Sequence, residues 1–219
     1  MCERMVRHSE LAAIRARFRV RSKAMPAIDA GGEITPGALC PVIRRIKGGR
    51  EIVSARWGLA LDHPLLGEGP HAAIRAGALR RAAALEFLLE TGRCIVPIEA
   101  FHAGPARQAR TGRSWAFALE DETVMGLAAL LLPGHGAAPG SFALVTTSPN
   151  ESVALLADSM PFILFPEDEK TWLAPGTDPY DAFTLIKPYP GELMRAWPVA
   201  APAGKGGRKD GPDLLRRVA

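Results

Sequence analysis

The residue with the clearest capacity for covalent chemistry is Cys2, in a chain that begins Met1-Cys2-Glu3-Arg4. Removal of Met1 would leave Cys2 as the N-terminal residue, with a free α-amine and a thiol on adjacent carbon atoms. Both groups are partly nucleophilic near neutral pH, because their reference pKa values are about 7.7–8.0 for the amine and about 8.5 for the thiol. The amine can form an imine with an aldehyde, and the thiol can then close a ring onto that imine. The alternative interpretation is an idle thiol close to a frayed chain end.

No other residue pattern points as clearly to chemistry. The remaining cysteines, Cys40 in ALCPVI and Cys94 in RCIVPI, lie in apolar surroundings that are typical of small core residues. Three cysteines at wide spacings fit neither a disulfide framework nor a zinc site, and the five histidines show no metal-ligand spacing. The sequence also contains no P-loop, dinucleotide fingerprint or Gly-x-Ser-x-Gly motif. We therefore expect no metal and no other cofactor.

The composition predicts a single domain, 1–219, with 47% hydrophobic and 23% charged residues. The net charge of +4 permits a nucleic acid partner without demonstrating one. The N-terminal region carries charges from Glu3 onwards and lacks the apolar core of a secretory signal. The longest apolar run, 124–132, is too short to span a bilayer. Together with a cysteine usage suited to a reducing compartment, these features predict a cytoplasmic protein with no membrane partner.

Segments with strand character outnumber segments with helix character. The patterns predict strands over 93–98, 114–119, 123–132, 141–147 and 160–165, and a hairpin whose strands, 39–46 and 51–57, flank Gly48-Gly49. Helices are expected after a cap at Ser9-Glu10, over 79–90, after Pro149, over 166–172 and after Asp178-Pro179. The fold class expected is α+β, with a largely antiparallel, barrel-like sheet and peripheral helices. The Gly-, Lys- and Arg-rich end, 201–219, is expected to be a mobile basic segment.

Seven segments, taken in chain order, resemble segments of one known family. They are MCERM (1–5) for MCGRF, EITPG (33–37) for NIAPT, ARWGLA (55–60) for MRWGLIP, IRAGA (74–78) for NARSET, RCIVPIEAFHAG (93–104) for RCLVPADGFYEW, VTTSPNESVALLADSMPFIL (145–164) for LTTEANELLAPIHDRMPVIL, and GPDLL (211–215) for GPELI. The chain is similar over nearly its whole length to the SRAP family, the SOS response-associated peptidase-like proteins that process abasic sites. Seven matches in order make chance similarity a poor explanation.

The resemblance implies a small barrel-like α+β domain with a basic groove for DNA. In that family the initiator methionine is removed, and the N-terminal cysteine forms a thiazolidine with the ring-opened aldehyde of an abasic site in single-stranded DNA. Cys2 would then be the nucleophile, and Arg4 and Arg75 would contact phosphate or hold the strand near the site. A threonine of the family corresponds to Thr146. The expected partner is single-stranded DNA with abasic sites, bound by a protein that we expect to be a monomer.

The same comparison implies that several assisting groups are missing. The family's asparagine falls on Ala73, one glutamate on Gly77, a second glutamate on Ala103 and the histidine on Ala157. In the family the second glutamate and the histidine shuttle protons, and a positioned acid or base typically contributes about 10²–10⁴-fold. Their loss predicts a severely slowed reaction, although an N-terminal cysteine and an aldehyde condense unaided and tethering supplies proximity. Glu3 also replaces a small glycine and adds a negative charge beside the expected DNA path.

Nearby residues are candidates for the missing roles, against the alternative that each is an ordinary surface residue. His102 and Asp158 are adjacent to Ala103 and Ala157, but neighbouring side chains on an extended chain face opposite sides. Glu99 lies too far along its strand, and His71 shares the strand parity of Ala73.

Two further features carry two interpretations each. Trp57 is either a half-buried sheet aromatic or a stacking surface for an unstacked base. The alternating arginines over 15–21 are more typical of a solvated face than of a DNA clamp.

Three functions therefore remain open. The first is a divergent SRAP-like protein of the DNA damage response that binds single-stranded DNA, senses abasic sites and links to them slowly through Cys2. The second is a catalytically inactive relative that serves as a DNA-binding or interaction module. The third, a cysteine peptidase-like hydrolase, ranks last because the sequence offers no evident histidine base for Cys2.

Overall fold

The computed structural model describes residues 4–22, 26, 28, 31–81, 83–103, 113–136 and 138–200. Cys2 and the expected basic segment, 201–219, lie outside the described residues, so their predicted roles stay predictions.

The centre of the fold is a closed ring of strands. Its members are β3 (Leu39–Ile46), β4 (Gly49–Trp57), β6 (Arg93–Ile98), β9 (Met125–Leu132) and β10 (Gly140–Thr147). They follow the order β10-β4-β3-β6-β9, and pairing of β9 with β10 closes the ring. All contacts within the ring are antiparallel except the β4–β10 pairing. The expected barrel-like, largely antiparallel sheet is confirmed, as is the hairpin, where Gly48 adopts a φ of 91°.

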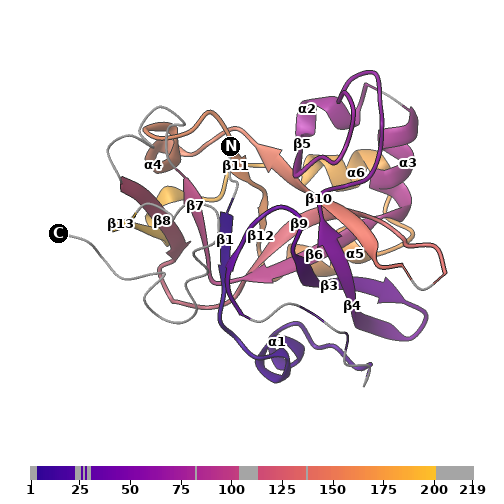
Figure 1. The fold of residues 1–219 in the computed structure, drawn as a ribbon, viewed down its shortest axis with the longest axis horizontal. Coiled ribbons are helices and arrows are strands. Elements are labelled where there is room, and N and C mark those ends of the chain that lie inside the picture. The colour runs from indigo at the N-terminus through magenta and orange to yellow at the C-terminus, as the bar shows by residue number, and fades with distance from the viewer. Residues whose placement is uncertain are drawn as a thin grey trace.

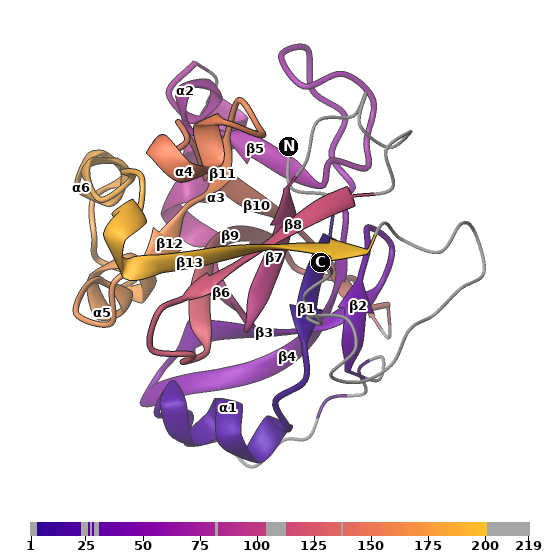
Figure 2. The same ribbon diagram turned by 90° about the vertical axis from the view of Figure 1, so that its left-hand side faces the viewer.

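A second, open sheet lies against the ring, in front of it in Figure 2. Its order is β13-β8-β7-β1-β2, and every pairing is antiparallel. The strands are β1 (Arg4–Arg7), β2 (Gly32–Ile34), β7 (Ala100–Ala103), β8 (Arg113–Leu119) and β13 (Met194–Ala200). The chain passes from β6 into β7 through Glu99, whose backbone N–H donates to Val6 O at 3.0 Å. The Glu99 carboxylate accepts hydrogen bonds from the backbone N–H groups of His8 and Ser9, so it fixes the end of β1.

Three short strands extend the ring at one end. β5 (Ala73–Arg75) runs parallel to the second half of β10, β11 (Met160–Pro161) pairs with β10, and β12 (Ile163–Leu164) pairs with β9. The single strand predicted over 160–165 is therefore wrong in detail, because its two halves pair with different neighbours. Between them, buried Phe162 donates to Val145 O and accepts from Ala128 N.

Helices surround the ring (Figure 1). They are α1 (Leu11–Arg17), α2 (Ala76–Leu79), α3 (Ala83–Thr91), α4 (Glu151–Ala154), α5 (Asp168–Leu173), α6 (Pro179–Thr184) and a 3₁₀ turn, Gly191–Leu193. The helix predicted over 79–90 is broken into α2 and α3. Leu79 and Leu85 are both fully buried, whereas a continuous helix would turn them about 120° apart. The predicted side-chain cap of α1 is also absent, since Glu10 makes no capping bond.

Both faces of the ring are buried, because adjacent residues of its strands enter different apolar clusters. Val42 belongs to an inner cluster with Met5, Phe101 and the second sheet, whereas Ile43 belongs to an outer cluster under the helices. This two-sided burial explains the continuous apolar runs of β6, β9 and β10.

Arg93 is a polar tie within the outer layer. Its guanidinium is buried at the start of β6 and donates to the carbonyls of Leu89, Trp172, Ala174 and Thr177. The carbonyls of Leu89, Trp172 and Ala174 lie at the ends of α3 and α5, and that of Thr177 lies in the turn before α6, so one side chain holds these helix ends against the ring.

Candidate functional site

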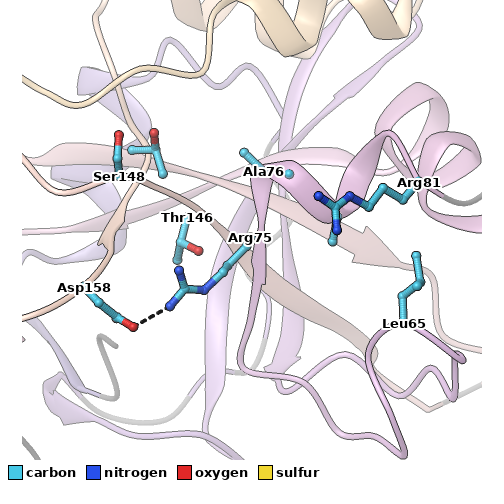
Figure 3. Close-up of a pocket in the computed structure, with 10 residues that line it drawn as sticks. Leu65, Arg75, Ala76, Arg81, Thr146, Ser148 and Asp158 are labelled. Carbon is cyan, nitrogen blue, oxygen red and sulfur yellow. Dashed lines mark hydrogen bonds and ion pairs between the residues drawn. The ribbon is translucent and has the colours of Figure 1, made fainter.

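A pocket of about 460 Å³ lies where β5, α2 and the end of β10 meet (Figure 3). Its walls carry two guanidinium groups, three hydroxyl groups and one carboxylate. The lining residues are Leu65, Arg75, Ala76, Gly77, Ala78, Arg81, Thr146, Thr147, Ser148 and Asp158. The sequence predicted three of the ten as family positions, namely Arg75, Gly77 and Thr146.

Arg75 is the last residue of β5 and is held opposite Thr146 by the parallel pairing with β10. Its side chain is 61% exposed and donates a 2.6 Å hydrogen bond to Asp158, which is 70% exposed. This bond, followed by one from the Ser159 hydroxyl, lowers the pKa of Asp158 below its ordinary value. Arg75 is therefore a solvent-accessible cation with a carboxylate as its present partner.

Thr146 lines the same pocket but is only 2% exposed. Its hydroxyl donates a long hydrogen bond of 3.4 Å to Ile74 O in the neighbouring strand. The structure thus brings Thr146 and Arg75 together (Figure 3). The threonine is buried, whereas the arginine is exposed.

Trp57 is not half-buried, as the sequence suggested. It is 1% exposed and packs in the inner cluster, and its indole N–H donates to Ala72 O at 2.8 Å. Because the indole ring of Trp57 is buried, neither of its faces is open for a base to stack on in the described part of the chain. We correct the interpretation of Trp57 to a core residue that anchors the segment leading into β5.

Arg4, two residues after Cys2, opens β1 and lies opposite His102 of β7. Its guanidinium forms an ion pair with Glu33 of β2 and donates to the Ser114 hydroxyl at 3.1 Å. The side chain is 15% exposed. The first described residue of β1, Arg4, is thus tied by its side chain to β2 and β8 of the second sheet.

His102 lies beside Arg4 and faces away from Ala103, as the alternation of a strand predicts. Its side chain is 3% exposed, and Nδ1 lies 3.8 Å from the Glu33 carboxylate. Within the described part of the chain, neither ring nitrogen has a hydrogen-bond partner. Burial, and secondarily the charge of Arg4, lower the pKa of His102 to about 4. The imidazole is therefore neutral near pH 7.

Three of the positions at which the resemblance predicts missing family residues lie against one apolar cluster. Ala103 is 4% exposed and belongs to the inner cluster, and Ala73 and Ala157 pack against that cluster. Gly77 differs, because a Cβ atom at this position would meet nothing within 4 Å. At the three positions where the resemblance predicts lost polar groups, Ala73, Ala103 and Ala157 thus contribute apolar packing.

The other candidate residues have structural partners. His71 Nε2 hydrogen-bonds Leu61 O at 2.8 Å, and Glu99 fixes the end of β1 as described. Burial raises the pKa of the Cys94 thiol far above its ordinary value, so this cysteine is an unreactive core residue. Cys40 is also fully buried.

Sequence reasoning missed the two charged residues that complete the pocket. Arg81 lies on its wall after α2, and Asp158 holds Arg75 although it was considered only as a replacement acid. The pair Arg80-Arg81 after a short apolar segment is a signal that could have identified Arg81.

Neither a metal centre nor a membrane segment emerges from the parts of the chain that the structure describes. No three histidine, cysteine or carboxylate side chains there gather closely enough to hold a metal ion. Likewise, none of the described helices combines the length and apolar character that a bilayer span requires.

Comparisons with known proteins agree with this architecture. A model of the SOS response associated peptidase (SRAP) family matches residues 1–205. The abasic site processing proteins YoqW and YoaM of Bacillus subtilis (strain 168) are 30% and 29% identical over 131 residues. Each match covers 58% of this chain and 58% of the relative, so it spans less than two thirds of the relative's length.

Two crystal structures share the fold. A protein from Bacteroides thetaiotaomicron is 19% identical, with a TM-score of 0.82 and full coverage of both chains. A phage-related protein from Bordetella bronchiseptica is 17% identical, with a TM-score of 0.72 over 90% of this chain and 94% of the other. Because the family model extends from β1 past the end of β13, the chain belongs to the SOS response associated peptidase (SRAP) family.

Proposed function

We propose that this protein binds single-stranded DNA that contains abasic sites and links to them slowly through Cys2. The observation that carries the proposal is the pocket with Arg75 and Arg81, whose open cations suit a DNA phosphate. Membership of the family and relatives named as abasic site processing proteins support the same lesion as substrate. Arg4, held two residues from Cys2, would keep the nucleophile close to this end of the second sheet.

The covalent step requires removal of Met1, so that Cys2 carries a free amine. The amine attacks the aldehyde carbon of the ring-opened deoxyribose, and loss of one water molecule gives an imine. The thiol sulfur then bonds to the imine carbon, and the thiol proton ends on the nitrogen. The product is a thiazolidine, formed from one amine, one thiol and one aldehyde with one water released. No oxidant or metal is needed.

The rate is proposed to be low because acid/base assistance is poor. Ala103 and Ala157 carry no proton-transfer group, and they pack on an apolar cluster. His102 is neutral, yet it is enclosed beside Arg4 and faces away from Ala103. What remains is proximity, supplied by DNA held through Arg75, Arg81 and Arg4.

The test is a denaturing gel after long incubation with an oligonucleotide that carries one abasic site. We expect a shifted band for the native protein, and none for Cys2→Ala. Cys2→Ser is the matched control, since it keeps the amine and the size but cannot form the thioether bond. Intact mass spectrometry must show that Met1 is absent. If protein that has lost Met1 gives no shifted band, the covalent step is refuted.

A catalytically inactive DNA-binding module is the second candidate. The observation in its favour is that Ala73, Ala103 and Ala157, where the resemblance predicts lost polar groups, all contact the same apolar cluster. Equal, salt-sensitive binding of native protein and Cys2→Ala to undamaged single-stranded DNA, without any shifted band, would support this candidate. A peptidase activity has no observation in its favour, and Cys2-dependent cleavage of a peptide would be needed to support it.

A further inference from the structure

A second basic surface lies at the tip of the β3–β4 hairpin and the C-terminal end of α1. We call it the hairpin surface, and define it by Arg17, Arg19, Arg21, Arg45, Lys47 and Arg50. In both views it lies at the opposite end of the molecule from β5, β11 and α4 (Figures 1 and 2). It is therefore separate from the pocket that contains Arg75.

Backbone contacts hold these cations on adjacent segments. The N–H of Arg21 donates to Arg50 O at 3.3 Å, so the chain after α1 runs beside β4. Arg45 stands directly opposite Arg50 in the β3–β4 register. The guanidinium of Arg50 donates to Phe18 O at 3.0 Å, and this side-chain contact connects the end of α1 to the hairpin.

A single buried carboxylate serves this surface and is already paired with two of its cations. Glu169 of α5 is 3% exposed, and its two oxygens accept from Arg17 at 2.9 Å and from Arg50 at 2.8 Å. Four exposed side chains have no carboxylate partner among the residues that the structure describes: Arg19, Arg21, Arg45 and Lys47. The surface therefore carries an uncompensated positive charge.

Two of these arginines stand where local structure disfavours them. Arg19 follows α1 with a φ of 52°, and the bonds from Arg19 N to Ala16 O and from Val20 N to Arg15 O form a Schellman motif. This position normally holds glycine, because a side chain is strained there.

Arg45 is the second case, since like charges directly opposite on an antiparallel pair repel. Neither arginine is explained by stability, which indicates that the charge itself is used.

We propose that the hairpin surface binds the phosphate backbone of nucleic acid, as a second contact site remote from the pocket. Guanidinium groups bind phosphate oxygens in a bidentate manner, and a row of them on adjacent segments suits a repeating anion. A protein partner fits less well, because interfaces between proteins have an apolar core, and the exposed large apolar side chain here is Ile46 at 37%. The proposal does not depend on Cys2 chemistry.

The test compares Arg19→Gly/Arg45→Gln with Lys187→Gln/Arg195→Gln, a control that also removes two positive charges but at residues outside the hairpin surface. The probes are an undamaged 20-nucleotide single strand and its duplex, titrated by fluorescence anisotropy from about 50 to 200 mM salt. We expect the hairpin variant to bind ~10-fold more weakly at 100 mM salt. The negative slope of log K against log salt should become shallower by about 1.4 for the single strand, because two phosphate contacts are lost. The control variant should match the native protein.

Thermal unfolding separates binding from stability. Glycine suits the backbone of residue 19 and glutamine removes a repulsion from residue 45, so the hairpin variant should melt at or above the native temperature. Equal salt slopes for the two double variants would overturn the proposal. So would competition by polyglutamate as effective as that by the oligonucleotide, because it would assign the surface to acidic protein. All these readings use undamaged DNA, so an absence of crosslinking through Cys2 would leave them unaffected.

Discussion

The guanidinium of Arg75 donates a 2.6 Å hydrogen bond to the carboxylate of Asp158 at the mouth of the pocket. Both side chains are more than half exposed, and such ion pairs contribute only about 0–1 kcal/mol to stability. A phosphate that enters the pocket must therefore displace a weak partner, and Asp158 acts as a competitor for Arg75. The first prediction follows from this competition.

Asp158→Asn should strengthen binding of single-stranded DNA by roughly 3- to 10-fold at low salt, because it frees Arg75 and removes a negative charge near the DNA phosphates. Fluorescence anisotropy with an undamaged oligonucleotide measures the change. Glu122→Gln is the matched control, since it breaks a similar pair, Arg195–Glu122 at 2.6 Å, between β13 and the connection from β8 to β9. Equal affinities for Asp158→Asn and native protein would show that the carboxylate does not compete.

Restoring two missing groups should accelerate the proposed crosslinking. Ala103→Glu/Ala157→His reintroduces a carboxylate and an imidazole, and the rate of band formation should rise on the order of 10²-fold. The same variant should unfold at lower denaturant concentration, because a carboxylate at Ala103 is placed in a buried position. Adding Cys2→Ala must abolish the band. An unchanged rate in a folded double variant would argue that these positions do not serve the reaction.

Gly77→Glu introduces the glutamate that the resemblance predicts to be absent, at the one of the four such positions where a side chain would meet open space. The structure leaves room for a side chain there, so the variant should keep its thermal stability. A carboxylate beside Arg75 and Arg81 should nevertheless weaken DNA binding several-fold through charge repulsion with phosphate. Gly77→Gln, of the same size but uncharged, should bind like the native protein. A loss of stability in both variants would contradict the open geometry at this position.

Arg93→Met should destabilise the fold by about 3 kcal/mol or more, because four carbonyl groups, at the ends of α3 and α5 and in the turn before α6, lose their donor. Urea unfolding followed by circular dichroism measures this loss. Lys170→Met, on the exposed side of α5, should stay within about 0.5 kcal/mol of the native protein. A similar loss of stability for both variants would mean that the hydrogen bonds of Arg93 do not stabilise the contact of these helices with the ring of strands.

The buried imidazole of His102 predicts acid lability. Its pKa is lowered to about 4 in the folded protein, against an ordinary value of 6.5. Between these values the unfolded chain binds the extra proton, so folding stability falls as pH decreases through this window. The full effect is about 3 kcal/mol.

His102→Gln keeps a polar side chain of similar size and removes the titration. The difference in unfolding free energy between the variant and the native protein should therefore change by about 3 kcal/mol between pH 7 and pH 4, in favour of the variant. Parallel pH curves would contradict the neutral, buried state of the imidazole.

The ring strands β6, β9 and β10 were predictable from sequence because they are buried on both faces and form nearly continuous apolar runs. The strands β3 and β4 were predictable as a hairpin around Gly48-Gly49. The broken helix over 79–90 was not, since its pattern is consistent with one helix and only the position of Leu79 and Leu85 against the same core requires two. The same limit applies to the segment 160–165, where pairing with two different strands divides a run that looks uniform.

The pocket shows the other boundary of sequence reasoning. Arg75 and Thr146 were predicted as site residues from a family resemblance, and β5–β10 pairing places them opposite each other, while their role in binding stays a prediction. The bond between Arg75 and Asp158 joins residues 83 positions apart, so no local pattern encodes it. The prediction that Trp57 is half-buried was wrong for a related reason. The burial of its indole ring depends on tertiary contacts with Ala72 and the inner cluster, which no local pattern encodes.

The closure of the ring has a consequence for the order of folding. In the pairing of β4 with β10, Ala55 lies opposite Gly140, so this contact of the ring joins segments that are far apart in the chain. Long-range strand pairing is slow because loop-closure entropy is lost before any contact is gained. During synthesis, the edges of β4 and β9 stay unpaired until β10 leaves the ribosome. A nascent chain stalled before residue 140 should accordingly be far more sensitive to protease and to aggregation than one stalled shortly beyond β13.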